Sequence, residues 1–329
     1  MSMELKIVCS QQYFGMSGTL GKIEPKNQII IGKGDQILSS YFADPFFQNG
    51  VGGNTMYELS NAYCWFTQYK DDEIETNSNA YAILKSFSGF LQTFNHALWF
   101  ITDHSLNIGV VYGYSDQTKR TYSLNEKSMY SSSKGEYSTK TFSDSELDSG
   151  RNIFDTFTSL VERHATYKDI QIADAIITEA LVAPINLIPY NAGNKIDRLI
   201  AFLFEARQKS NLPLRISFYI SALECLFTSD VGDLTHKIAE RTAFFLGGTS
   251  EEKIEIFNLV KSAYGLRSKY FHGQRLEKHH ATIELQKDLS QKLDKIIRRV
   301  ASKVILEESD KFLLPDDSYK KWINNIIFT

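Results

Sequence analysis

Two residues toward the carboxyl-terminal end of the chain, Arg267 and His272, are of types that together could act on a phosphodiester. A guanidinium group is permanently charged and binds phosphate oxygens through paired hydrogen bonds, so arginine can stabilise negative charge that builds on phosphorus. Imidazole titrates near neutral pH, so histidine can take up and release protons. RNA carries its own nucleophile, the 2′-hydroxyl. Such a pair could therefore cleave RNA without a metal ion or another cofactor.

The spacing of the pair limits how it could act. Five positions turn an ideal helix by about 500°, which leaves the two side chains roughly 140° apart. Gly265 and Gly273 flank the pair, so a bend or a helix end nearby could bring the side chains together, or each could act with its counterpart from a second subunit. A third interpretation is purely structural: Arg267 forms a salt bridge, and His272 and Gly273 cap a helix.

Three sequence blocks contain or precede the pair in a definite order. They are Ile220-Ser-Ala-Leu-Glu-Cys-Leu-Phe227, then Leu234-Thr-His-Lys-Ile-Ala-Glu-Arg-Thr-Ala243, then Tyr264 with Arg267-Ser268 and His272-Gly273. In this order they resemble the ApeA-like branch of the HEPN family, over roughly residues 195–305. The residue after the arginine is often Asn, Asp or His across HEPN ribonucleases, and this chain has Ser268 there.

The resemblance implies an all-helical, dimeric domain that cuts RNA without metal, with two Arg/His pairs facing each other across a cleft. It implies Arg267 and His272 as catalytic residues. Related proteins act in bacterial defence against phage, through abortive infection, and in toxin–antitoxin systems. On this basis we expect an RNA substrate and a homodimer, with no cofactor and no metal.

Glu224 interrupts the longest apolar stretch of the chain, Ile216 to Phe227. An unpaired buried carboxylate is very costly, so we expect Glu224 to pair with Arg241 or Arg267. The pair could orient the catalytic arginine or serve the fold alone. The residues that we expect to support the site are Glu224, Arg241, Tyr264 and Ser268, and those that we expect to bind RNA are Lys269 and Arg275.

The elements that must position these residues fall into two halves. Alternating residues near Leu5, the run Gln28–Ile31 and the stretch Leu106–Tyr114 predict strands. Apolar residues at three- and four-residue steps predict helices over 83–99, 153–161, 196–207, 214–227 and 285–304. Asp233 and the box Thr249-Ser-Glu-Glu252 predict helix starts. We therefore expect an α+β domain over residues 1–150, followed by an all-α helical-bundle HEPN domain over residues 151–329, with the polar stretch 115–150 as the boundary.

Charge and composition narrow the class of protein. Residues 1–148 hold 11 basic and 16 acidic side chains, whereas residues 265–303 hold ten basic and four acidic ones. A basic stretch attracts phosphate backbones, although charge runs often form only the solvated face of a helix. The three cysteines are widely spaced and form no CxxC pair, and no apolar run could cross a membrane. We expect a cytoplasmic protein without a membrane partner.

These observations favour a metal-independent endoribonuclease that acts as a homodimer in anti-phage defence. The amino-terminal domain would bind a phage or cellular trigger, or select the target. One alternative is a non-catalytic HEPN module that binds RNA or acts as a scaffold. The other is an interaction protein whose amino-terminal domain senses a ligand and whose helical half only dimerises.

Overall fold

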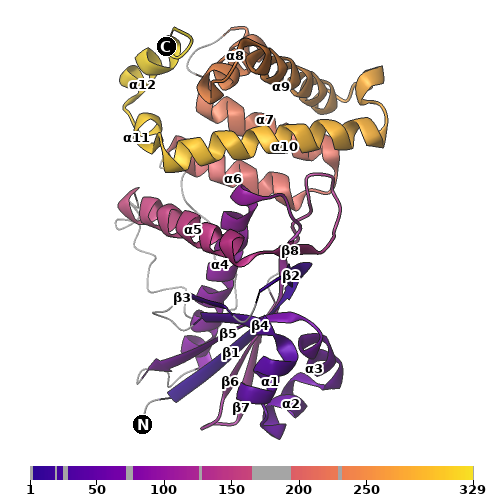
Figure 1. Ribbon diagram of the computed structural model, residues 1–329, viewed down its shortest axis with the longest axis vertical. Helices are drawn as coiled ribbons and strands as arrows, with labels where there is room; N and C mark the ends of the chain where they lie inside the picture. The colour runs from indigo at the N-terminus through magenta and orange to yellow at the C-terminus, as the bar shows by residue number, and fades with distance from the viewer. Residues whose placement is uncertain are drawn as a thin grey trace. The chain divides into compact units, whose positions relative to one another are not determined.

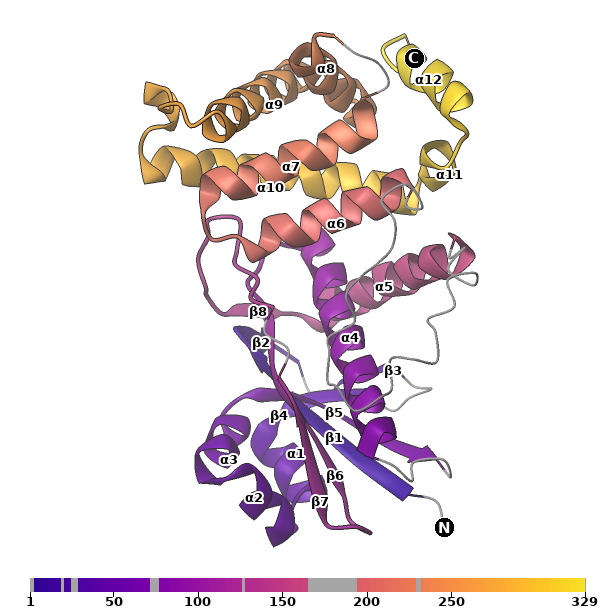
Figure 2. The ribbon, with the colours of Figure 1, turned by 180° about the vertical axis from the view of Figure 1, so that it is seen from behind.

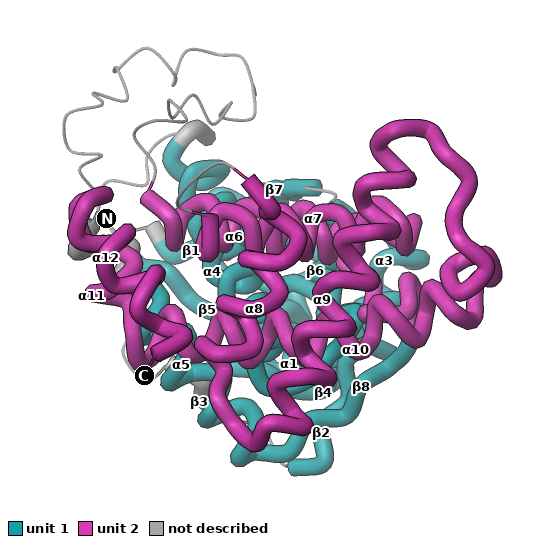
Figure 3. Tube along the Cα trace, turned by 90° about the horizontal axis from the view of Figure 1, so that it is seen from above, with its two compact units in different colours: residues 1–129, 138–181 teal, residues 130–137, 182–329 magenta. Residues whose placement is uncertain are grey.

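The computed structural model describes residues 3–18, 21–24, 29–71, 77–125, 128–164, 194–228 and 232–328. The chain divides into two compact units, drawn in different colours in Figure 3. The first contains Met1–Met129 and Ser138–Leu181, and the second contains Tyr130–Tyr137 and Val182–Thr329. Among the described residues, no helix is long and apolar enough to cross a membrane.

The first unit is built on a six-stranded antiparallel sheet in the order β3-β4-β5-β1-β6-β7. Its strands are β1 (Met3–Gln12), β3 (Gly21–Glu24), β4 (Ile29–Lys33), β5 (Tyr63–Asp71), β6 (Asn107–Ser115) and β7 (Arg120–Leu124). A separate parallel pair is formed by β2 (Phe14–Met16) and β8 (Lys140–Phe142). The strands predicted near Leu5, in the run that includes Ile29–Ile31 and in the stretch that ends at Tyr114 are therefore confirmed.

Both faces of the sheet are covered, because side chains of β1 alternate between two hydrophobic clusters. Leu5, Ile7 and Cys9 pack with α4 (Asn77–Ile101), whereas Val8 packs with the short helices of the other face. Those helices are α1 (Gly34–Tyr41), α2 (Pro45–Val51) and α3 (Gly53–Ser60), and Figures 1 and 2 show them together beside the sheet.

The predicted boundary at residue 150 falls inside α5 (Asp144–His164). This helix packs along α4, and its Phe154 contacts Phe90 at 4.9 Å between ring centroids, so α5 belongs to the α/β unit. The apolar stripe predicted over 153–161 does form a helix, and its Phe154 packs against the first core. Pro184 and Pro189, at which the sequence predicts breaks between helices, lie outside the described residues.

The second unit is helical, as predicted. It contains α6 (Lys195–Gln208), α7 (Leu212–Phe227), α8 (Leu234–Leu246), α9 (Ser250–Phe271), η4 (Lys278–His280), α10 (Ile283–Leu306), α11 (Ser309–Phe312) and α12 (Asp316–Asn325). Helices α6 and α7 pack as one pair and α8 and α9 as another, and α10 runs along α7 and α9 (Figures 1 and 2). The predicted order, a region with helices and a sheet followed by a helical region, is confirmed.

A short segment from earlier in the chain, Tyr130–Tyr137, belongs to the helical unit, and we call it the clip. Arg215 of α7 donates to the carbonyl oxygens of Ser131 and Ser132. Ser290 of α10 donates to Ser133 O at 2.6 Å, and Lys287 pairs with Glu136 at 2.6 Å. The clip therefore ties α7 to α10. Its tight turn needs Gly135, which has φ +74°, and a Cβ there would lie 2.6 Å from Ser210 O.

Candidate functional site

An ion pair between α7 and α9 forms the centre of the candidate site. Nη2 of Arg267 lies 2.8 Å from Oε2 of Glu224, and the side chains are 25% and 20% exposed. Glu224 lies on the long apolar helix α7, whose N-cap is Asn211 and whose second residue is Pro213. Of the two arginines that we expected as partners, Arg267 makes the ion pair. The pair joins the two helices at the edge of the core and remains reachable from solvent.

Tyr264 completes this group from one turn earlier on α9. Its hydroxyl hydrogen-bonds Glu224, and a second hydrogen bond comes from Thr235 of α8. Burial raises the pKa of the Glu224 carboxyl above its ordinary value, although Arg267 and the tyrosine hydroxyl both act to lower it. Burial also raises the pKa of Tyr264, and the neighbouring Glu224 adds to that shift. Three helices therefore hold a carboxylate whose charge is not fully compensated by its neighbours.

Arg241 lies elsewhere in the helical unit. It is 6% exposed and donates to Phe227 O at 2.5 Å and to Asn324 Oδ1 at 2.6 Å. These bonds anchor the end of α7 and the carboxyl-terminal helix α12. These two bonds serve helix ends and differ from the ion pair of Glu224, so the supporting role of Arg241 stays a prediction.

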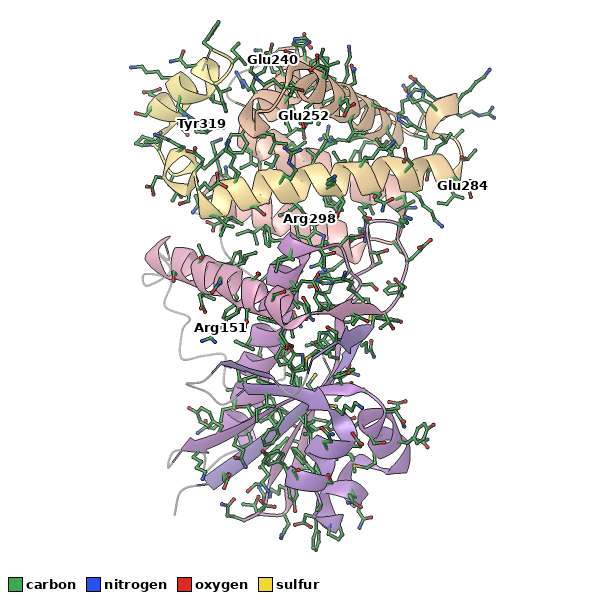
Figure 4. All side chains as sticks on the ribbon, viewed as in Figure 1. Arg151, Glu240, Glu252, Glu284, Arg298 and Tyr319 are labelled. Atoms are coloured by element: carbon green, nitrogen blue, oxygen red, sulfur yellow. The ribbon has the colours of Figure 1, made fainter. Side chains whose placement is uncertain are left out.

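The end of α9 determines where His272 lies. The helix starts with the predicted capping box, in which Thr249 Oγ1 accepts from Glu252 N and Glu252 Oε2 accepts from Thr249 N; Glu252 is labelled in Figure 4. It runs unbroken through Gly265, so the bend that we considered there is absent, and it ends with His272 as the C-cap.

Past this cap, Gly273 has φ +64°, and Gln274 N donates to Lys269 O at 2.9 Å while Gly273 N donates to Tyr270 O at 3.1 Å. This pair of bonds is the Schellman arrangement. The predicted helix end at the motif is therefore confirmed, and the histidine ring is exposed at the tip of the helix.

The guanidinium group of Arg267 keeps part of its binding capacity. It lies over the rings of Tyr264 and Phe271, each with 5.6 Å between Cζ and the ring centroid. Its Nε is buried and has no hydrogen-bond partner among the described residues. One edge of the group is thus held by Glu224 and two aromatic rings support its plane. This geometry fixes the orientation of the cation while part of the group stays accessible to an anion.

The remaining predicted residues lie around the end of α9. The carbonyl oxygen of Ser268 accepts a hydrogen bond from His272 N at 3.1 Å, so its backbone takes part in the end of the helix. Lys269 pairs with Glu277 at 3.0 Å, and Arg275 is exposed in the loop that follows. Figure 1 shows this loop, η4 and the start of α10 together at one end of the helical unit.

His280, for which the sequence indicated no role, anchors this loop. It is 3% exposed, its Nε2 lies 2.9 Å from Ser262 Oγ, and its carbonyl accepts from Gln286 Nε2 at 2.9 Å. Burial lowers the pKa of His280, and the neighbouring His279 lowers it further. Thr235 and Phe271 were also missed. Phe271 could have been found from the sequence, because it stands four positions after Arg267 and so shares its face of the helix.

No family model, curated protein or solved structure matches this chain. Within the described part of the chain, no group of three or more His, Cys, Asp or Glu side chains could hold a metal ion. The candidate site therefore offers an oriented guanidinium, an exposed imidazole and nearby cationic side chains. That set can bind an anion and transfer protons.

Proposed function

We propose that the helical unit is an endoribonuclease of the HEPN type, with Arg267 and His272 as its catalytic residues. The observation that carries this proposal is the Glu224–Arg267 ion pair, which orients the arginine while its side chain stays 25% exposed. The arginine is therefore held in one orientation without being fully buried. The exposed His272 follows on the same helix end, where a substrate can reach it.

In this proposal, Arg267 binds the scissile phosphate and stabilises the negative charge that builds on it. His272 removes the proton from the 2′-hydroxyl, whose oxygen attacks the adjacent phosphorus. The P–O5′ bond breaks, and the leaving oxygen takes up a proton. The products are a 2′,3′-cyclic phosphate and a 5′-hydroxyl end. Glu224 and Tyr264 are positioning residues, because they act through Arg267.

The proposal includes a homodimer. Arg267 and His272 lie about 140° apart around α9 if the helical spacing is extended to the cap. A single imidazole is also poorly suited to act at once as base on the 2′-hydroxyl and as acid on the 5′-oxygen. Two copies of α9 facing each other would supply two arginines and two histidines to one cleft. The spacing problem and the need for a second proton donor thus have the same solution.

The test is cleavage of a defined single-stranded RNA by the purified full chain, with EDTA present, compared with His272→Ala. An acid–base residue contributes about 10²–10⁴-fold, so His272→Ala should nearly abolish cleavage. His279→Ala is the matched control, since His279 is exposed in the same loop. DNA should resist, because it lacks the 2′-hydroxyl. Equal cleavage by the His272→Ala variant, or a requirement for Mg²⁺, would contradict the proposed chemistry.

The biological setting is part of the same proposal: a cytoplasmic nuclease of anti-phage defence whose acidic amino-terminal unit binds a trigger or selects the target. The motivation is that a nuclease lethal to its host needs restraint. Charge-reversing substitutions in that unit should change toxicity in cells without changing the cleavage products. RNA binding by a dimer that never cleaves would instead favour a non-catalytic module.

A further inference from the structure

A large aromatic side chain, Phe271, lies exposed directly beside the two proposed catalytic residues. It is the last residue of α9, and 58% of its side chain is exposed. The Arg267 guanidinium lies over its ring, and the Tyr270 ring meets it edge-on at 5.7 Å and 70°. Exposing a phenylalanine ring to water is unfavourable, but Arg267 and Tyr270 contact this ring on the protein side. The ring is thus presented to solvent in a fixed position.

Two cationic side chains follow this ring in the chain: Arg275 and Lys278 are exposed in the segment after α9. The acidic residue among them, Glu277, is engaged by Lys269 at 3.0 Å. An exposed aromatic ring bordered by cations is the combination that binds single-stranded nucleic acid, because a base stacks on the ring while its phosphates meet the cations.

We propose that Phe271 is a stacking platform for one unpaired base of the RNA, next to the phosphate that Arg267 binds. This inference rests on the proposed function and names its substrate class, which is single-stranded RNA. A base within a duplex is already stacked on its neighbours and cannot reach the platform without unpairing. The platform therefore selects loops and single strands through stacking, with little preference for base identity.

The experiment uses the full chain carrying His272→Ala, so that RNA binds without being cut, and a short single-stranded RNA with one 2-aminopurine. Stacking quenches the fluorescence of this base. We expect quenching when the labelled position lies at the bound phosphate, its loss with Phe271→Ala, and its retention with Phe271→Trp. Affinity should fall about tenfold with Phe271→Ala, since one base stacked on an aromatic side chain contributes about 1–3 kcal/mol. Annealing a complementary strand should also abolish the quenching.

The matched control is Ile254→Ala, since Ile254 is 59% exposed on the same helix but lies near its start. Quenching that survives Phe271→Ala at every labelled position would overturn the platform. So would a Phe271→Ala protein that loses only its dimer, because Phe271 would then be an interface residue. The two proposals fail separately: Phe271-dependent quenching without any cleavage by the unmodified chain would remove the nuclease, and cleavage without such quenching would remove the platform.

Discussion

Arg215 and Arg267 lie on two helices of the same unit that pack together, yet their guanidinium groups have opposite surroundings. Arg215 is fully buried, and all its donor atoms are engaged; its acceptors are the carbonyl oxygens of Lys209, Ser132, Ser131 and Arg207 and the Ser131 hydroxyl. Arg267 is 25% exposed, has one ion pair, and has an Nε without a described partner. A fully buried, saturated cation holds the fold, whereas an oriented and partly exposed one can bind an anion.

The comparison predicts first that the clip cannot be removed from the helical unit. A chain that begins at residue 151 lacks the acceptors of Arg215, Ser290 and Lys287. We expect it to be less stable than the helical unit of the full chain by roughly 5 kcal/mol, since a whole buried network is broken. Thermal unfolding checks this, and an excess of a peptide of residues 129–138 should raise the melting temperature by mass action. A scrambled peptide is the control; no difference between the two peptides would contradict the role of the clip.

The second prediction concerns Arg215 alone. Arg215→Met keeps the length and the apolar stem but leaves buried carbonyl groups of the clip without donors. We expect a loss of about 3–4 kcal/mol in the free energy of unfolding, measured with urea, because each unsatisfied buried acceptor costs about 1–3 kcal/mol. Arg198→Met, on the neighbouring helix α6, is a control for removing one arginine from this unit. A stability equal to that of the unchanged chain would mean that the clip is held by other contacts.

The third prediction is the converse, for Arg267. Arg267→Lys keeps the charge but loses the planar, two-donor edge that a phosphate needs. Cleavage should fall about 10²–10³-fold, as for the loss of one donor to a developing oxyanion, while the melting temperature changes little. Comparison with Arg215→Lys gives the sharpest contrast: that variant should lose stability, and any cleavage it retains per folded molecule should be normal. If Arg267→Lys unfolds the chain instead, Arg267 is structural.

How much the sequence could predict follows the same division between local and distant causes. Helix starts at Asp233 and Thr249, the C-cap at His272 and the pairing of Glu224 depend on nearby residues or on one simple electrostatic rule, so they were predictable. The clip was not, because Arg215 binds carbonyl groups 83 and 84 residues away, and a carbonyl has no side-chain signature. The boundary at residue 150 falls inside α5 because the packing of this helix along α4 also joins distant parts of the chain.

The candidate site also depends partly on local sequence and partly on contacts between distant residues. The two arginines that we weighed for Glu224 could not be separated from the sequence, since both lie on other helices than Glu224, Arg241 on α8 and Arg267 on α9. Only the packing of α9 against α7 brings Arg267 to the carboxylate and leaves Arg241 to bind Phe227 O. Thr235 of α8 likewise reaches the site only through helix packing, which brings it within hydrogen-bonding distance of Tyr264.

The fourth and smallest expected effect is that of Glu224→Gln, which separates positioning from stabilisation. Because burial raises the pKa of Glu224 despite the Arg267 partner, the charged carboxylate adds little to stability at neutral pH. We therefore expect a change of at most about 1 kcal/mol in the free energy of unfolding, but an approximately tenfold loss of cleavage, since the guanidinium loses its fixed edge. Glu240→Gln, at a charged position on α8 labelled in Figure 4, is the control.

The raised pKa of Glu224 determines how the free energy of unfolding should change with pH. A carboxyl group whose pKa is raised by folding binds its proton more tightly in the folded state than in the unfolded chain. Its favourable contribution is complete below the ordinary value of 4.5 and is lost as the pH rises through the raised pKa. The amide of the Glu224→Gln variant cannot titrate, so the free energy of unfolding of the unchanged chain should fall relative to that of the variant as the pH rises above 4.5 and through the raised pKa of Glu224. Urea unfolding of both proteins across that range measures the difference. A difference that moves in the other direction would show that Arg267 lowers the pKa more than burial raises it, and Glu224 would then stabilise the fold as well as position Arg267.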